Sequence, residues 1–362
     1  MQWLLLIILI PYIYLITKIY LSLKTITSFH PKTDPEIFVS VIVACRNEER
    51  ALPLILSDIA GQTYNPDLFE LIIVNDNSSD STFEVASGFS RIKNIKVLNS
   101  NGKGKKKAIR TGVEASAGSQ IITTDADCRI GKNWLKTIAS FQAEHKPEMI
   151  ISPVKLEGRK GFFYRFQELE FLSLQGITAG TSVGENPVMC NGANLAFQKE
   201  TYLNHAGNLH DELASGDDVF LLHNIKSYPD KRIMWLDSAE ATAVTRTSGN
   251  LSSFLHQRVR WISKAGAYID RFTKVLAIVT FVTIATQFLL LLGGLFFSGL
   301  LWVFAVYFVL KSVPDFLVLS NTAGRYDKKN LMRWFLPSQL VYPLYVVAIV
   351  LCSVVNRVKW SY

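Results

Sequence analysis

A long apolar stretch without a single charged residue, from Val275 to Leu310, constrains the fold of this chain more than any other feature. At about 1.5 Å per residue, one helix of that length would overrun a bilayer core of about 30 Å. We therefore expect a hairpin of two membrane spans that turns near residues 293–299, followed by a third span at residues 334–355. Buried helices of a soluble protein are the weaker interpretation, because uncharged runs of this length are rare in soluble folds.

The amino-terminal segment is also apolar, and residues 1–17 carry no charge before Lys18 and Lys24. A secretory signal peptide would begin with basic residues and end in a small-residue cleavage site. Neither is present, so we expect a retained membrane anchor at residues 1–24.

The formal net charge of +8 is concentrated in two clusters. One lies at residues 103–107, and the other, at residues 325–333, falls between two predicted spans. Basic loops between spans usually face the cytoplasm, so the second cluster predicts a cytoplasmic loop and a cytoplasmic catalytic domain, typically at a bacterial inner membrane. No basic stripe with interleaved aromatic residues appears, so we expect no nucleic-acid partner. The four cysteines form no CxxC pair, which favours reduced thiols over a zinc site.

Between the anchor and the hairpin, residues 31–270 have the pattern of one catalytic domain, and residues 274–356 that of a membrane region. Strand patterns are predicted at residues 38–45, 69–76, 95–98, 120–125 and 149–154, with helices at 49–62, from 82, and at 105–117. This alternation predicts an α/β fold with a mostly parallel sheet and helices on both faces. Such sheets bind ligands beyond the carboxyl ends of their strands, where polar residues gather in this sequence.

Two pairs of aspartates are candidates for the chemistry. Asp125 and Asp127 directly follow an apolar strand, and carboxylate oxygens in that arrangement suit Mg²⁺ or Mn²⁺ beside a diphosphate. Alone, an Asp-x-Asp is as often a solvated turn. Asp217 and Asp218 precede an apolar run and offer a general base, or simply the acidic first turn of a helix. Asp76, at the end of the second strand, is a candidate nucleotide ligand, with Asp80 or Ser81 capping the next helix.

The segment before the hairpin carries a third candidate. Gln257, Arg260 and Trp261 share one helical face, and an arginine fork suits phosphate oxygens. The alternative is a membrane-interface helix with snorkelling arginines. Residues 161–175 form a second candidate interfacial helix, whose apolar stripe could equally be buried in a core.

Together, these residues resemble the family 2 glycosyltransferases of the GT-A fold, over residues 38–265. Residues 39–49 resemble the family's first nucleotide-binding strand and loop, and residues 74–80 its Val-Asp-Asp-Gly-Ser-x-Asp segment, from which Asn75 and Asn77 depart. The remaining likeness lies in Gly104-Lys105, Asn191–Asn194, Gly216–Asp218 and Gln257-x-x-Arg260-Trp261.

The resemblance implies a metal-dependent inverting transferase with a nucleotide-sugar donor and a GT-A type Rossmann-like sheet. It implies a metal held by Asp127 with Asp125, and Asp218 as the base, with Asp217 less favoured. The implied donor contacts are Ala44, Arg46, Glu48, Asp76, Lys105, Asp125, Gln257 and Arg260. The implied acceptor contacts are Asn191, Gly192, Asn194 and Trp261.

Two functions remain open within this family. One is transfer of a single sugar to a lipid-linked or other membrane-borne acceptor, in cell-envelope glycan synthesis. The other is processive polysaccharide synthesis, which the Gln-x-x-Arg-Trp pattern favours but which three carboxyl-side spans hardly accommodate unless the chain forms a homo-oligomer. A non-catalytic scaffold is disfavoured because every expected carboxylate is present. A dinucleotide-dependent oxidoreductase is disfavoured because no G-x-G-x-x-G follows the first strand.

Overall fold

The computed structural model describes residues 2–32, 34–213 and 215–355, and the chain divides into two compact units. The helical unit comprises Met1–Ile26, Gly158–Val188 and Thr247–Ser361. The sheet unit comprises Thr27–Glu157 and Met189–Arg246, together with Tyr362. Each unit is therefore assembled from segments that are separated in the sequence.

The sheet unit is built on a seven-stranded sheet with the order β3-β2-β1-β4-β8-β6-β9. Its strands are β1 (Val39–Cys45), β2 (Phe69–Asn75), β3 (Ile95–Asn99), β4 (Gln120–Asp125), β6 (Met149–Ile151), β8 (Asn194–Gln198) and β9 (Ile233–Trp235). The pairings β1–β2, β1–β4, β2–β3 and β6–β9 are parallel, and only β8 runs antiparallel to its neighbours β4 and β6. The predicted mostly parallel sheet is confirmed.

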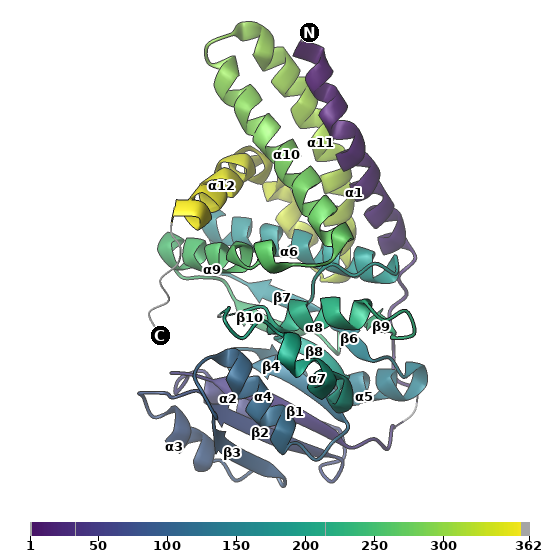
Figure 1. Cartoon of the computed structure of the whole chain (residues 1–362), viewed down its shortest axis with the longest axis vertical. Helices are drawn as coiled ribbons and strands as arrows, with labels where there is room; N and C mark the ends of the chain where they lie inside the picture. The colour runs from purple at the N-terminus through teal and green to yellow at the C-terminus, as the bar shows by residue number, and fades with distance from the viewer. Residues whose placement is uncertain (1, 33, 214, 356–362) are drawn as a thin grey trace. The chain divides into compact units, whose positions relative to one another are not determined.

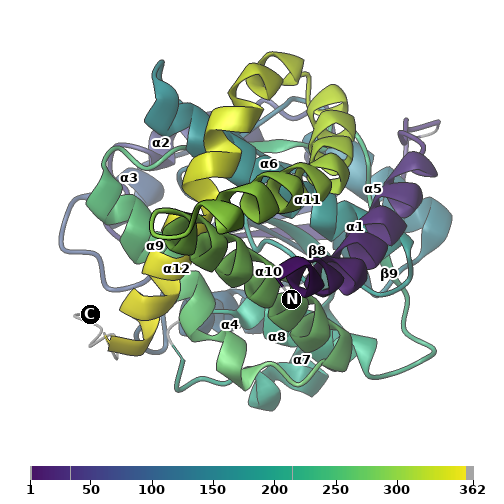
Figure 2. The same cartoon turned by 90° about the horizontal axis from the view of Figure 1, so that it is seen from above.

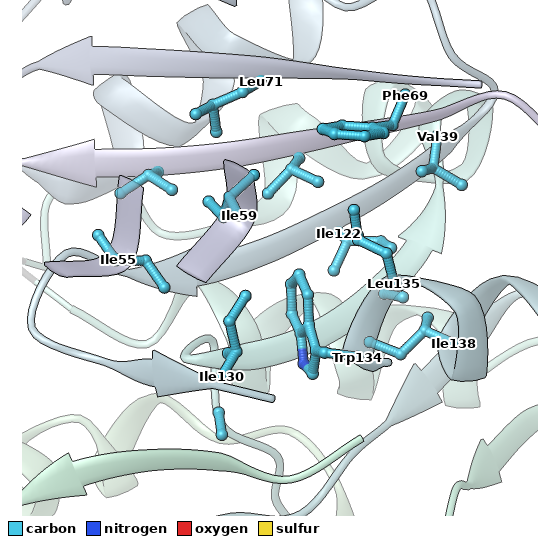
Figure 3. Close-up of a cluster of buried hydrophobic side chains, with 14 of the residues drawn as sticks. Val39, Ile55, Ile59, Phe69, Leu71, Ile122, Ile130, Trp134, Leu135 and Ile138 are labelled. Atoms are coloured by element: carbon cyan, nitrogen blue, oxygen red, sulfur yellow. The ribbon is translucent and has the colours of Figure 1, made fainter. Parts of the chain in front are cut away.

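Helices cover both faces of this sheet (Figure 1). They are α2 (Leu52–Ala60), α3 (Thr82–Ser87), α4 (Lys105–Ala115), α5 (Trp134–His145), α7 (Lys199–His205), η2 (Ala206–Asn208) and α8 (Asp217–Lys226). On one face, the fully buried Trp134 of α5 and Ile55 and Ile59 of α2 pack against the strands (Figure 3). On the other face α4 approaches so closely that a Cβ on Gly112 would lie 2.6 Å from Cγ2 of Ile42.

The predicted strand at residues 149–154 is wrong as a single element. The structure divides it into β6, which ends at Ile151, and β7 (Val154–Glu157). Pro153 separates the two strands, because proline has no N–H to continue a hydrogen-bonded ladder. Strand β7 joins a second, three-stranded sheet with β10 (Ala243–Arg246) and β5 (Arg129–Ile130), in the order β5-β10-β7.

The helical unit contains η1 (Gln2–Ile8), α1 (Leu9–Lys24), α6 (Phe162–Val183), α9 (Leu251–Ser263), η3 (Ala265–Ala267), α10 (Arg271–Gly294), α11 (Ser298–Arg325), η4 (Lys329–Trp334) and α12 (Phe335–Val355). In the described part of the chain, four helices are long and apolar enough to cross a membrane. They span Trp3–Lys24, Arg271–Gly294, Ser298–Arg325 and Lys329–Ser353. The expected amino-terminal helix and three carboxyl-side helices are thus present, and α1, α10 and α11 run side by side (Figures 1 and 2).

A polar cluster ties α1, α11 and α12 together inside this bundle. Lys311 is only 1% exposed, and its ammonium lies 2.8 Å from both Asp315 and the side-chain oxygen of Gln339. The hydroxyl of Tyr12 donates to Asp315 at 2.6 Å. Charged groups in an apolar bundle are stable only when paired in this way, so the cluster fixes which helix faces meet.

Helix α6 is longer than the predicted interfacial helix at residues 161–175, and its apolar stripe is buried. Phe166, Leu169 and Leu172 are each about 5% exposed or less, and the two leucines pack on α11 and η4. Gly180 lies so close to α1 that a Cβ there would be 2.6 Å from Cγ2 of Ile19. The stripe therefore belongs to the core of the helical unit, which agrees with the second interpretation of this segment, a stripe buried in a core.

Candidate active site

Several residues that the sequence predicts to bind the donor lie at one edge of the central sheet. Strand β1 lies between β2 and β4, and Ala44 is opposite both Val74 and Asp125 in the two registers. Because these strands are parallel, their carboxyl ends deliver Arg46, Asp76 and Asp125 to the same edge. Arg46 is exposed and Ala44 half-buried.

Asp76 connects the end of β2 to the start of α4. Its carboxylate, 5% exposed, accepts a hydrogen bond from the N–H of Gly104 at 2.8 Å. Gly104 has φ of 97°, a conformation that favours glycine, and it directly precedes α4. Asp80 accepts from the N–H of Thr82 at 3.0 Å, so Asp80 orders the start of α3 as the capping interpretation expects.

Lys105, the first residue of α4, is the cation at the centre of this acidic region. Its ammonium forms an ion pair with Asp125. Burial alone would lower the pKa of Lys105, but the nearby carboxylates of Asp125, Asp217 and Asp218 raise it above its usual range. Lys105 therefore stays charged and links the end of β4 electrostatically to the start of α8.

The remaining carboxylates at this edge carry an excess of negative charge. Burial, and then the charges of Asp127, Asp125 and Asp80, raise the pKa of Glu48 to about 7. Partial loss of water, and then the charge of Asp125, also raise the pKa of Asp127, whose Oδ2 accepts from the hydroxyl of Thr245 at 3.1 Å. Neighbouring negative charge that raises the pKa of Glu48 and Asp127 in this way favours the arrival of a cation.

Asp218, in the first turn of α8, is held against the loop before β8. Its Oδ2 accepts from the N–H of Gly192 at 3.0 Å, and the carbonyl of Gly192 accepts from the hydroxyl of Thr123 at 2.8 Å. A Cβ on Gly192 would lie 3.7 Å from Cβ of Asp218 and 3.8 Å from Nζ of Lys105. Gly192 thus marks the point where the candidate base and the candidate donor lysine come together.

The two asparagines of the expected acceptor loop differ in their surroundings. Asn191 is half-buried, and its side-chain oxygen accepts from the N–H of Ala193 at 3.0 Å. Asn194 is fully buried; its amide nitrogen donates to the carbonyls of Pro153 at 2.6 Å and Ala241 at 2.7 Å. Its oxygen accepts from the indole of Trp134 at 3.0 Å. The side chain of Asn194 therefore joins the two sheets in the interior and is not at a surface that a ligand can reach.

Within the described residues, no group of three or more His, Cys, Asp and Glu side chains is arranged to hold a metal ion by itself. Asp125 and Asp127 supply two carboxylates of the kind that hard divalent ions prefer, in a region with surplus negative charge. A donor diphosphate would bring further oxygen ligands. The residues fit a metal that is shared with a bound nucleotide.

Gln257, Arg260 and Trp261 lie on α9 in the helical unit. Arg260 is exposed, whereas Gln257 and Trp261 are half-buried. The structure adds a residue that the sequence patterns do not single out. Arg258 is 3% exposed, donates to both carboxylate oxygens of Glu170 at 3.0 and 2.6 Å, and lies 4.2 Å from the ring centre of Trp261. Only the position of Arg258 on the same face as Phe254, one turn earlier, could have suggested its burial.

Known proteins resemble part of this chain at about 30% identity and nearly its whole length at lower identity. Residues 40–204 match the family described as "Glycosyl transferase family 2". The chain is 30% identical over 124 residues to the poly(ribitol-phosphate) beta-N-acetylglucosaminyltransferase TarS of Staphylococcus aureus, an alignment that covers 34% of this chain and 21% of TarS. This chain thus spans about a fifth of the length of that relative.

Two further proteins resemble the chain over nearly its whole length. It is 22% identical to the poly-beta-1,6-N-acetyl-D-glucosamine synthase of Staphylococcus epidermidis, with 98% of this chain and 92% of that protein aligned. The mannosyltransferase PcManGT from Pyrobaculum calidifontis, solved in complex with GDP-Man and Mn2+, shares the fold with a TM-score of 0.62 at 17% identity. That match covers 99% of this chain and 100% of that one.

Proposed function

We propose that this chain, in which residues 40–204 match the glycosyl transferase family 2, moves a sugar from a nucleotide-sugar donor to a membrane-borne, typically lipid-linked, acceptor with inversion at the anomeric carbon. The observation that carries this proposal is that Lys105 and Asp218 meet at Gly192, while Lys105 also pairs with Asp125. A single displacement is favoured by a base for the incoming hydroxyl and by cations that stabilise the leaving diphosphate.

In the proposed reaction, Asp218 accepts the proton of the acceptor hydroxyl. The hydroxyl oxygen attacks the anomeric carbon from the face opposite the diphosphate, and the bond between that carbon and the diphosphate oxygen breaks. The nucleoside diphosphate leaves with the bonding electron pair, so a single displacement inverts the configuration without an enzyme nucleophile. Asp217 is the less favoured base.

The donor is proposed to lie along the edge formed by β1, β2 and β4. Asp76, Glu48, Arg46 and the backbone at Ala44 face its nucleoside, and Lys105 stays charged beside its diphosphate. Asp127 and Asp125 would hold Mg²⁺ or Mn²⁺, which supplies charge neutralisation of the leaving diphosphate when bound.

The helical unit is proposed to supply the remaining contacts. Gln257 and Arg260 would steady the diphosphate, and Trp261 would face the acceptor together with Asn191 and Gly192. We place residues 31–270 in the catalytic domain, the span 1–24 and the region 274–356 in the membrane, and the catalytic domain on the cytoplasmic side of a bacterial inner membrane. The basic residues Lys328, Lys329 and Arg333 between α11 and α12 support that orientation.

Processive polymer synthesis is the second candidate. The alignment over 98% of the chain with a polysaccharide synthase favours it, as does the Gln-x-x-Arg-Trp pattern. The four candidate spans among the residues that the structure describes favour single transfer, unless a homo-oligomer provides a path for the polymer.

A donor screen tests the proposal. The purified full-length protein in liposomes of native lipid is offered a panel of nucleotide sugars, and release of nucleoside diphosphate is measured with the Asp218→Asn variant as the matched control. We expect one donor to be turned over by the wild type and not by the variant. Turnover of no donor, or equal turnover by both proteins, contradicts the proposal. The size of the glycan product then separates single transfer from processive synthesis.

A further inference from the structure

The first two turns of α4 carry four cations, Lys105, Lys106, Lys107 and Arg110, which have two different sets of partners. Lys105 pairs with Asp125, as described above. Lys106, Lys107 and Arg110 instead contact the segment of residues 206–211. That segment follows α7 and leads, through Gly216, to the candidate base at the start of α8.

Lys106 is the buried member of the cluster. Its side chain is 5% exposed, and its ammonium donates to the backbone carbonyls of Leu209 at 2.6 Å and His210 at 2.7 Å. A buried ammonium is costly unless acceptors surround it, so these two carbonyls and the ammonium hold one another in place. The ammonium also lies 4.9 Å from the centre of the Phe220 ring in α8.

Lys107 and Arg110 hold the same segment from the neighbouring surface of α4. The ammonium of Lys107 lies 2.8 Å and Nη1 of Arg110 3.0 Å from Oδ2 of Asp211. Arg110 also donates to the carbonyl of Ala206. Both ion pairs are partly exposed, so they contribute less than the contacts of the buried Lys106.

The start of α8 is fixed through the same contacts. The ring of His210 lies 4.5 Å from the ring of Phe220. The backbone N–H of Phe220 donates the first hydrogen bond of α8 to the carbonyl of Gly216 at 2.8 Å. Phe220 is therefore in contact with both Lys106 and the residue whose carbonyl Lys106 binds. Displacing residues 209–210 would release Phe220 and, with it, the turn that carries Asp217 and Asp218.

We propose that Lys106 is a positioning residue, which holds residues 209–210 so that Asp218 keeps its place relative to Asp125. One turn of α4 would then hold both sides of the reaction, the donor side through Lys105 and the base side through Lys106. This inference rests on the proposed function of Asp218. The competing interpretation is that the whole basic cluster attracts the donor diphosphate, but the ammonium of Lys106 is turned into the protein.

The test compares Lys106→Met with wild type in the full-length protein. Lys93→Met is the matched control, since Lys93 is an exposed lysine of the same unit that pairs only with the exposed Asp67 among the contacts of the described residues. Three quantities are measured: amide hydrogen exchange of peptides in residues 206–222, the donor KM, and kcat for both transfer and donor hydrolysis.

We expect Lys106→Met to raise exchange in residues 206–213 about tenfold and to lower kcat about tenfold or more, because small misplacements of a catalytic group are costly. The donor KM should stay within about twofold, and Lys93→Met should match wild type in all three quantities. Asp211→Asn, which leaves Lys106 in place, should shift exchange and kcat in the same direction but by only about two- to threefold. It serves as the working variant if Lys106→Met does not fold.

Three outcomes overturn the proposal. Faster exchange with unchanged kcat would show that the segment does not position the base, and a raised donor KM with unchanged exchange would show that Lys106 serves the donor. The exchange measurement does not depend on turnover. If wild type turns over no donor, the proposed function fails. Equal exchange in wild type, Lys106→Met and Asp211→Asn would instead show that α4 does not hold residues 206–213 in place.

Discussion

At the scale of single residues, the two neighbouring aspartates of α8 have different surroundings. Asp218 accepts a hydrogen bond from the N–H of Gly192, beside Lys105. Asp217 and Asp218 both line one small cavity, which Tyr202 also lines, and burial and then the charge of Asp217 raise the pKa of the Tyr202 phenol. The two therefore differ in their hydrogen-bond partner and not in their access to the cavity, and the choice of Asp218 as the base stays a prediction.

Replacing each aspartate by asparagine should show which of the two is the base. Asp218→Asn keeps the shape but removes the proton acceptor, so we expect transfer to fall by about 10²-fold or more with near-normal donor binding. Asp217→Asn should have a much smaller effect on the rate. Single-turnover transfer and nucleotide titration check this, and a rate loss confined to Asp217→Asn would reverse the assignment.

Asp127 offers a second test at this scale. Its raised pKa reflects lost water and a neighbouring carboxylate, conditions that a divalent ion relieves. We expect Asp127→Ala to abolish turnover and to remove the metal dependence of nucleotide binding, measured by calorimetry with and without Mn²⁺. Full activity of the wild type after chelation would be incompatible with this role.

The sequence patterns located the residues of the sheet edge but not the residues that hold them. Asp125 and Asp76 could be predicted because each directly follows an apolar run that becomes a buried strand. Lys106 could not, because its partners Leu209 and His210 lie about a hundred positions later and form no pattern with it. Asn194 was assigned to the acceptor through the resemblance of residues 191–194, and its burial could not be predicted because its partners Pro153 and Ala241 meet it only in the folded chain.

At the scale of elements, the strands β1, β2 and β4 lie within one residue of the predicted bounds, because continuous apolar runs with polar ends define them. The three-stranded sheet was not predicted. Strand β5 has only two residues, and β7 and β10 lie far apart in the sequence and depend on each other for pairing. Short strands of this kind carry too few residues for an alternation to be recognised.

Helices α6, α9 and α12 meet at one buried ion pair. Glu170 of α6 binds Arg258 of α9 through both carboxylate oxygens, and the hydroxyl of Tyr345 in α12 donates to the same carboxylate at 3.0 Å. The guanidinium lies between the rings of Phe254 and Trp261, at 4.7 and 4.2 Å from their centres. The orientation of Trp261 therefore depends on this pair.

Removing either Glu170 or Arg258 alone should lower the free energy of unfolding more than removing both. We expect Arg258→Met to destabilise the protein by about 3 kcal/mol because it leaves the Glu170 carboxylate buried without its cation, and the double variant Glu170→Met/Arg258→Met to lose less. Thermal unfolding in detergent measures the difference, with Arg260→Met on the exposed face of the same helix as control. If the double variant is no more stable than Arg258→Met, the unpaired Glu170 carboxylate is not the cause of the instability.

At the scale of the whole molecule, the four candidate spans of the described residues and the basic loop between α11 and α12 predict a topology. With the catalytic domain in the cytoplasm, the turn between α10 and α11 lies on the outer side. Phe296 in that turn is 80% exposed, which makes it a suitable labelling position.

Cysteine labelling checks this arrangement in a Cys352→Ala background, because Cys352 is an exposed native thiol. In spheroplasts, we expect a membrane-impermeant thiol reagent to label Phe296→Cys. Lys329→Cys, in the basic loop, should react only after the membrane is opened. Immediate labelling at Lys329 and protection at Phe296 would invert the topology, and labelling of neither or both would revise the number of spans.

The interleaving of the two units along the chain has a consequence for biogenesis. Strand β4 pairs with β8, yet the ribosome delivers α6 between them, so the sheet unit cannot close until a helix of the other unit has already emerged. When α6 appears, α1 is available to receive Gly180, but the partners of Leu169 and Leu172 on α11 and η4 have still to be made. For that interval the nascent chain presents an uncovered apolar stripe, the kind of surface that recruits chaperones or sticks to a bilayer during translation.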